Sequence, residues 1–214
     1  KAQTLSWSTN WGVANNYLFA FSAGTDYENN IYLCGGSVNP DGRISSALKY
    51  NEFGALQWEK TYYANDDSRF NSLSVSYIDG SSYIISVTGY NASSPYYGCR
   101  TVAYDQEGNE RFDELYYGPG YIYGFSTIGS QVITDGYGNT YVCGASPRAI
   151  NQFFPTYYYF LVAYDRYGNQ LFIRTWDGGY DDHARGLTLS GGNIYVTGYS
   201  QNSSSNWDVV TLAY

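Results

Sequence analysis

The chain has 214 residues, of which 43% are hydrophobic and 14% charged, a length sufficient for one domain with a substantial core. It carries 19 acidic and 11 basic side chains, and a net charge of −8 makes a nucleic acid an unfavourable partner. No apolar run reaches the ~18 residues that a spanning helix needs, so no membrane insertion is expected. The aromatic content of 20% argues against disorder.

A short apolar segment that ends in glycine recurs four times along the chain. The residue before the shared glycine is Cys34, Thr88, Cys143 and Thr197, at steps of 54, 55 and 54 residues. Four repeats of about 54 residues account for almost the whole chain. We therefore expect a single domain over residues 1–214.

The first repeat predicts four short strands and one tight hairpin. Its strands are expected at residues 17–22, 31–35, 47–50 and 56–62. The segment Asn-Glu-Phe-Gly at 51–54 is typical of a hairpin loop, because glycine tolerates a positive φ and Asn caps its own backbone. Repeats of ~40–50 residues with four strands each are typical of propeller blades.

The two ends of the chain are complementary in this pattern. The fourth repeat has only three expected strands before Tyr214, while Trp7 and Trp11 repeat the four-residue aromatic spacing of Trp58 and Tyr62. We therefore predict an all-β fold, a four-bladed β-propeller of four-stranded antiparallel blades, closed by the N-terminal strand completing the last blade. One alternative stays open: the same strand could complete a blade of a neighbouring molecule, giving a head-to-tail polymer.

The last repeat resembles a known family. Residues 176–200 contain an aromatic residue, Gly-Gly, paired Asp, Gly-Asn and the strand Ile-Tyr-Val-Thr-Gly, a pattern similar to the bacterial SBBP-type β-propeller repeat. The resemblance covers all four repeats but is close only in the fourth; the second has Ser81 and Ser82 where Gly-Asn is expected. It implies a secreted or cell-surface protein without a catalytic assignment, and it transfers no functional residues.

Metal and cofactor chemistry finds little support in the sequence. An odd number of cysteines, Cys34, Cys99 and Cys143, cannot close completely into internal disulfides, and no Cys-x-x-Cys pair is present. The three are expected to be small buried side chains rather than zinc ligands. No Asp-x-Asp-x-Asp-Gly loop occurs either. No metal and no cofactor are predicted.

Catalytic candidates are few. His183 is the only histidine, no Gly-x-Ser-x-Gly motif accompanies it, and we expect it in a surface loop. The carboxylate pairs at 66–67 and 181–182 could suggest a polysaccharide-cleaving enzyme. Adjacent residues point apart, however, and loop aspartates commonly cap backbone N–H groups. The sequence therefore predicts a protein that is not an enzyme.

Aromatic side chains crowd the connections between the expected strands, more than a core needs. Exposed tyrosines stack on sugar rings and make rigid protein contacts, and an apolar loop at 147–155 suggests a contact site. The predicted ligand or interface residues are Tyr96, Tyr97, Tyr121, Tyr123, Phe153, Phe154, Tyr157 and Tyr158. Two Asn-x-Ser sequons make Asn91 and Asn202 glycosylation candidates.

Three functions follow from this pattern. The first is a secreted or cell-surface, non-catalytic module that binds a glycan or an extracellular protein through Tyr-rich loops. The second is a structural subunit that binds copies of itself in an extracellular filament or surface layer, with or without strand exchange. The weakest is the polysaccharide-cleaving enzyme.

Overall fold

The computed structural model describes residues 7–10, 17–39, 42–64, 68–78, 82–93, 96–118, 125–148, 156–203 and 206–214. All the secondary-structure elements assigned in these residues are β-strands. A search of the same residues finds no helix that could cross a membrane. The strands are β1 (Tyr17–Thr25), β2 (Ile31–Asn39), β3 (Gly42–Tyr50), β4 (Leu56–Ala64), β5 (Ser68–Ile78), β6 (Ser82–Ser93), β7 (Tyr96–Tyr104), β8 (Glu110–Tyr116), β9 (Ile128–Thr134), β10 (Thr140–Pro147), β11 (Tyr157–Tyr164), β12 (Gln170–Trp176), β13 (Asp182–Ser190), β14 (Asn193–Ser203) and β15 (Asn206–Ala213).

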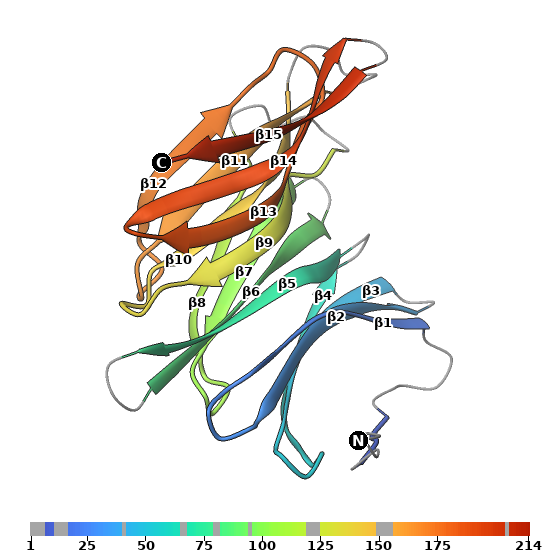
Figure 1. Ribbon diagram of the computed structural model, residues 1–214. Helices are drawn as coiled ribbons and strands as arrows, with labels where there is room; N and C mark the ends of the chain where they lie inside the picture. The colour runs from blue at the N-terminus through green and yellow to red at the C-terminus, as the bar shows by residue number, and fades with distance from the viewer. Residues whose placement is uncertain are drawn as a thin grey trace, which may run out of the picture.

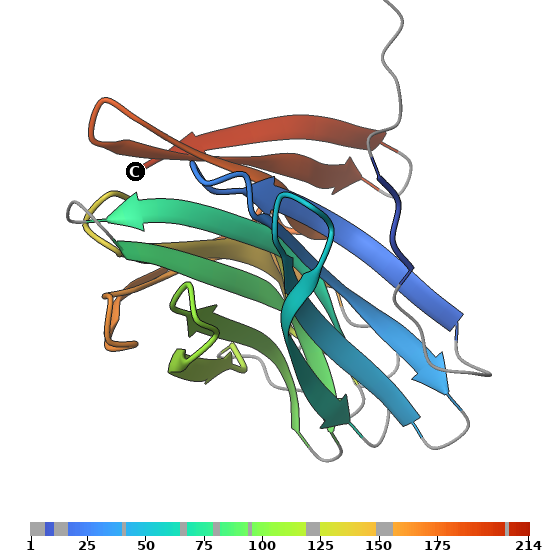
Figure 2. The same cartoon turned by 90° about the horizontal axis from the view of Figure 1, so that it is seen from below.

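The strands form four antiparallel sheets, one for each repeat. The first sheet is β1–β4, the second β5–β8, the third β9–β12 and the fourth β13–β15, each paired in chain order. Figures 1 and 2 show the four sheets packed one after another along the chain. The all-β repeat architecture predicted from the sequence is confirmed, with longer strands than expected in the first repeat.

The hairpin turns form for the local reasons that their residues indicate. In the turn between β7 and β8, the Asp105 carboxylate accepts hydrogen bonds from the backbone N–H groups of Glu107, at 3.0 Å, and Asn109, at 2.8 Å. Gly108 supplies the positive φ, 83°, that the turn requires. The third sheet repeats the arrangement with Asp165 and Gly168.

The shared glycine is explained by a close approach of two backbones. The first strand of each repeat bulges toward it, and a Cβ at Gly35 would lie only 1.9 Å from the carbonyl oxygen of Phe19. The corresponding distance is 1.9 Å at Gly89 and Gly144 and 2.0 Å at Gly198. No side chain fits at these four positions, which accounts for the repeat phrase.

Separate hydrophobic clusters hold each sheet to the next. Aromatic side chains of the outer strands reach across: the ring of Trp58 lies 5.7 Å from that of Tyr104, and the ring of Phe112 lies 5.9 Å from that of Tyr164. The core between the second and third sheets includes the fully buried Val142, and similar clusters join the other neighbouring sheets. The cores therefore lie between sheets.

The four sheets do not close into a ring within the described residues. Packing joins first to second, second to third and third to fourth sheet, but the described strands show no packing of that extent between the fourth sheet and the first. Residues 7–10 form no strand, and the fourth sheet has three strands. The segment 7–10, beside the first sheet, and β15 of the fourth sheet lie at opposite ends of the arrangement (Figure 1). The expected pairing of the N-terminal strand with β15 is therefore absent there; Trp7 instead donates from Nε1 to the Glu52 carbonyl oxygen at 2.9 Å.

Candidate binding surface

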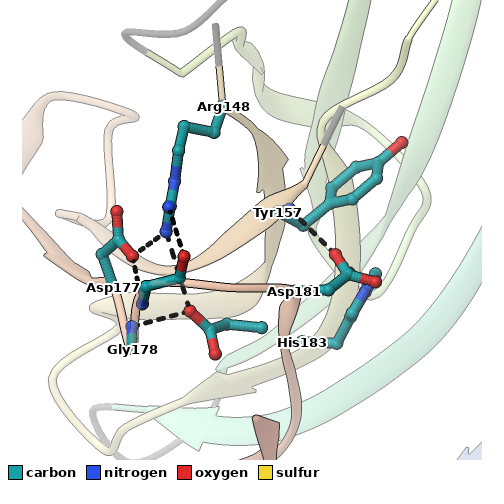
Figure 3. A network of polar contacts seen from close by, with 8 residues as sticks. Arg148, Tyr157, Asp177, Gly178, Asp181 and His183 are labelled. Atoms are coloured by element: carbon teal, nitrogen blue, oxygen red, sulfur yellow. Dashed lines mark hydrogen bonds and ion pairs between the residues drawn. The ribbon is translucent and has the colours of Figure 1, made fainter. Parts of the chain in front are cut away.

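A polar network joins the third and fourth sheets at one end of their junction (Figure 3). Arg148, which follows β10, donates from Nη1 to the Gly179 carbonyl oxygen at 3.1 Å and forms an ion pair with Asp177. The fully buried Asp182 lies 4.0 Å from the same guanidinium and accepts a hydrogen bond from the Gly178 N–H at 2.7 Å. These contacts fix the loop before β13 against the third sheet.

The neighbouring carboxylate serves different partners. Asp181 Oδ1 accepts a hydrogen bond from the Tyr157 N–H at 2.9 Å and lies 3.2 Å from Nε2 of His183 (Figure 3). The Asp181 carbonyl oxygen accepts from the Gln201 N–H at 2.9 Å. The two adjacent aspartates therefore point to separate structural contacts, as expected for consecutive residues. His183 lies within strand β13, half-buried, rather than in the surface loop predicted for it.

Four rings from four strands form what we call the aromatic ladder: Tyr157 of β11, His183 of β13, Tyr199 of β14 and Trp207 of β15. Successive ring centroids lie 5.0, 5.0 and 5.2 Å apart. Trp207 ends the ladder with its side chain 50% exposed. The guanidinium of Arg185 lies 5.3 Å over the Tyr199 ring and donates to its hydroxyl at 2.8 Å.

The ladder carries an uncharged imidazole at neutral pH. Burial lowers the pKa of His183 below its usual value and outweighs the opposing effect of Asp181. Burial and the same carboxylate raise the pKa of Tyr157. The positive charge beside the ladder is therefore that of Arg185, which the burial pattern leaves exposed.

The predicted aromatic residues fall in different places. Tyr157 joins the ladder, Tyr97 is half-buried in β7, and Tyr158 is buried at 6% exposure. The last placement corrects the prediction of Tyr158 as a contact residue: side chains alternate along β11, so Tyr157 and Tyr158 face opposite sides. The side chain of Tyr96, at the start of β7, is outside the described part of the structure. Also outside the described residues are Tyr121, Tyr123, Phe153 and Phe154.

Tyr199, Trp207 and Arg185 were not predicted, although a signal for Trp207 was present. The third expected strand of each repeat runs to a tyrosine: Tyr50, Tyr104, Tyr164 and Tyr214. Trp207 and Tyr157 each stand seven residues before that tyrosine in their own repeats. Tyr199 gives no such signal, because it reaches the ladder through its pairing with His183 across β13 and β14.

The two glycosylation candidates differ in access. Asn91 is 8% exposed within β6, paired with Ser68 on one side and Gly98 on the other. A side chain so placed is a poor acceptor in the folded protein. Asn202, at the end of β14, is exposed and its amide donates to the Asp208 carboxylate.

All three cysteines are buried, as predicted, and the structure has them as free thiols. Burial raises the pKa of Cys99 to about 11 and that of Cys34 and Cys143 to about 12, so all three stay protonated at neutral pH. Among the described residues no group of three or more His, Cys, Asp or Glu side chains is placed to hold a metal ion.

No family model matches this chain, and no curated protein does. The similarity to the SBBP-type repeat therefore stays a prediction from the sequence pattern.

Proposed function

We propose that the four sheets are blades of a β-propeller and that the protein is a secreted or cell-surface, non-catalytic module that binds a glycan or another protein at the aromatic ladder. The observation that carries this proposal is the exposed Trp207 at the end of a stack of three further rings, with Arg185 beside it. A glycan or protein partner would contact the indole by stacking and accept hydrogen bonds from the guanidinium.

The ladder is suited to binding because its rings are already held in place. Tyr199 contacts a ring on each side and accepts a hydrogen bond from Arg185, so a ligand would not have to order it. Side chains ordered before binding reduce the entropy lost on association, about 0.5–1.5 kcal/mol for each one that would otherwise be immobilised.

The same geometry favours binding over catalysis. Tyr157 and Tyr199 each pack on the His183 ring, and the Nε2 of that ring lies beside Asp181. Asp182 is fully buried, where a carbohydrate could not reach it. These groups hold the sheets together, and their engagement supports a protein without an acid–base pair.

A glycan array followed by titration of the strongest hit tests the proposal. Trp207→Ala should weaken binding about tenfold, because a buried aromatic contact contributes roughly 1.4 kcal/mol or more to such an interface. The matched control is Tyr167→Ala, which removes a ring that is 72% exposed in the turn after β11, away from the ladder. Equal affinity of the two variants, or turnover of the bound glycan, would contradict the proposal.

A further inference from the structure

The outer strands of the first and second sheets each dock on the hairpin turn of the next sheet through one aromatic side chain. The ring of Trp58, in β4, would lie 2.9 Å from a Cβ at Gly108, and its Nε1 donates to the Gln106 carbonyl oxygen at 3.1 Å. Phe112, in β8, packs in the same way on Gly168, 2.6 Å from the position of a Cβ. This contact therefore marks a junction between consecutive sheets.

Trp7 makes the same contact on the first sheet. Its ring lies 2.7 Å from the position of a Cβ at Gly54, and its Nε1 donates to the Glu52 carbonyl oxygen at 2.9 Å. Glu52 and Gly54 hold the positions in their turn that Gln106 and Gly108 hold in the next. The segment 7–10 thus occupies the position that the outer strand of a preceding sheet would take. Among the described strands, no sheet precedes the first one.

The rest of the first sheet's face toward this missing neighbour is open. Leu33 corresponds to Val87, Val142 and Val196, each two residues before the shared glycine. The three valines are at most 1% exposed, because the preceding sheet covers them. Leu33 is only half-buried and lines, with Leu18, a hollow of about 450 Å³. An apolar sheet face of this kind needs a covering partner.

The fourth sheet is open on its opposite face. Val209 pairs with Tyr199, the residue after the shared glycine of the fourth sheet. Ser45 and Tyr159 hold the same position in the first and third sheets, where they pair with Gly36 and Ala145. Ser45 and Tyr159 are each 1% exposed, because the following sheet covers them. Val209 is 83% exposed, and β15 has no partner beyond β14 among the described strands.

The two open faces complement each other. Across the first junction the hydroxyl of Ser45 hydrogen bonds to that of Ser68. Ser68 in the second sheet holds the position that Leu18 holds in the first. Ser68 pairs with Asn91 and Leu18 pairs with Ser37, and Asn91 and Ser37 each stand two residues after the shared glycine of their sheet. A fourth junction of the same kind places Val209 against Leu18. At the first junction two polar side chains, Ser45 and Ser68, meet. At the proposed junction two apolar side chains, Val209 and Leu18, would meet.

We propose that two copies of this chain close one ring. The fourth sheet of each copy packs on the first sheet of the other, and residues 7–10 of each copy lie beside β15 of its partner as the missing outer strand. Tyr199 and Trp207 project from the same face of the fourth sheet as Val209, because Tyr199 pairs directly with Val209 and Trp207 stands two residues before it. The second copy would therefore cover the exposed end of the aromatic ladder, so a second copy and a separate ligand are competing occupants of this face.

A second copy fits better than the chain's own fourth sheet. Bringing the first and fourth sheets of one chain together would require all three inter-sheet cores to repack, and those cores contain fully buried side chains such as Tyr32, Val142 and Val162. A partner supplies both missing surfaces without any change in the chain.

The number of copies follows from closure. Head-to-tail contacts give a ring where the rotation closes and a filament where it does not. Propellers contain about four to eight blades, and two copies of the four described sheets supply eight. Because four sheets leave the ring open here, eight sheets from two chains complete it.

Light scattering coupled to size exclusion tests the assembly on the 214-residue chain at micromolar concentration. We expect twice the chain mass of 24.0 kDa, favoured by added salt because each copy carries a charge of −8. Val209→Asp should yield monomers, and its control Leu171→Asp, at a 50% exposed position on β12, should stay dimeric. A monomeric parent chain, a polymer, or equal behaviour of the two variants would overturn the proposal.

A crosslinking variant distinguishes the occupants directly. In the doubly substituted Leu18→Cys, Val209→Cys chain, oxidation should produce a covalent dimer on a non-reducing gel, because Ser45 and Ser68 at the corresponding positions are in hydrogen-bond contact. The native cysteines are buried and do not compete. A band at the monomer mass would refute the two-copy ring, whether the crosslink forms within one chain or does not form. A series of bands larger than the dimer would refute it as well.

Discussion

The shared glycine gives the sharpest stability prediction. In Gly144→Ala the new Cβ would lie 1.9 Å from the Ile128 carbonyl oxygen and 2.8 Å from the Phe160 ring. Real Cβ atoms essentially never approach closer than 3.0 Å, so the bulge in β9 has to move by about 1 Å. We expect the move to break about one backbone hydrogen bond between β9 and β10, costing about 1 kcal/mol, and to strain a filled core by about 1–3 kcal/mol. The free energy of unfolding should fall by about 3 kcal/mol.

Urea denaturation of the two alanine variants measures this loss. Gly136→Ala is the matched control, because nothing lies within 4 Å of its Cβ position, and it should change stability by less than about 0.5 kcal/mol. Gly144→Ala should lower the urea midpoint with an unchanged slope and reduce Tm by roughly 10 °C. A loss at Gly144 no larger than that at Gly136 would refute the steric explanation of the repeat phrase.

Three further outcomes are expected. Asp26→Ala should lower the free energy of unfolding by about 2 kcal/mol in urea, because the carboxylate accepts hydrogen bonds from the Asn30 N–H and the buried Tyr32 hydroxyl, each at 2.9 Å; a loss below about 0.5 kcal/mol would contradict this. Burial lowers the pKa of His183, so the unfolded chain binds its proton more readily and stability should fall as pH drops through about 6.5; His183→Gln should flatten that slope, and identical thermal profiles at pH 7.5 and 5.5 would argue otherwise. The three thiols should ignore Ellman's reagent in the native protein at pH 8 and react fully in urea, whereas rapid native labelling would disprove their burial.

Much of each sheet could be inferred from local pattern. The Asx-x-x-Gly turns and the shared glycine describe contacts within one repeat, where strands that are neighbours along the chain pair with each other. Hairpin pairing needs only a short loop to close, so the residues that direct it lie close together in the sequence. The four antiparallel sheets were predictable for that reason.

The candidate surface was harder to predict. Tyr157 and Tyr158 look equivalent in the sequence, but only pairing in β11 shows which one enters the ladder and which one enters the core. Asn91 reads as an accessible sequon until β6 is seen to lie between two strands. Side-chain accessibility depends on the neighbours that a strand acquires, and a linear motif does not contain them.

Closure of the ring depends on geometry between sheets rather than within them. The repeat length, the strand pattern and Trp7 as an outer-strand residue are written locally in the chain. The angle at which one sheet packs on the next is a sum over many side chains at about 50 residues' separation, and a small change at each junction accumulates over three of them. Only the folded arrangement shows that Leu33 and Val209 remain open at opposite ends, which is the observation behind the proposed second copy.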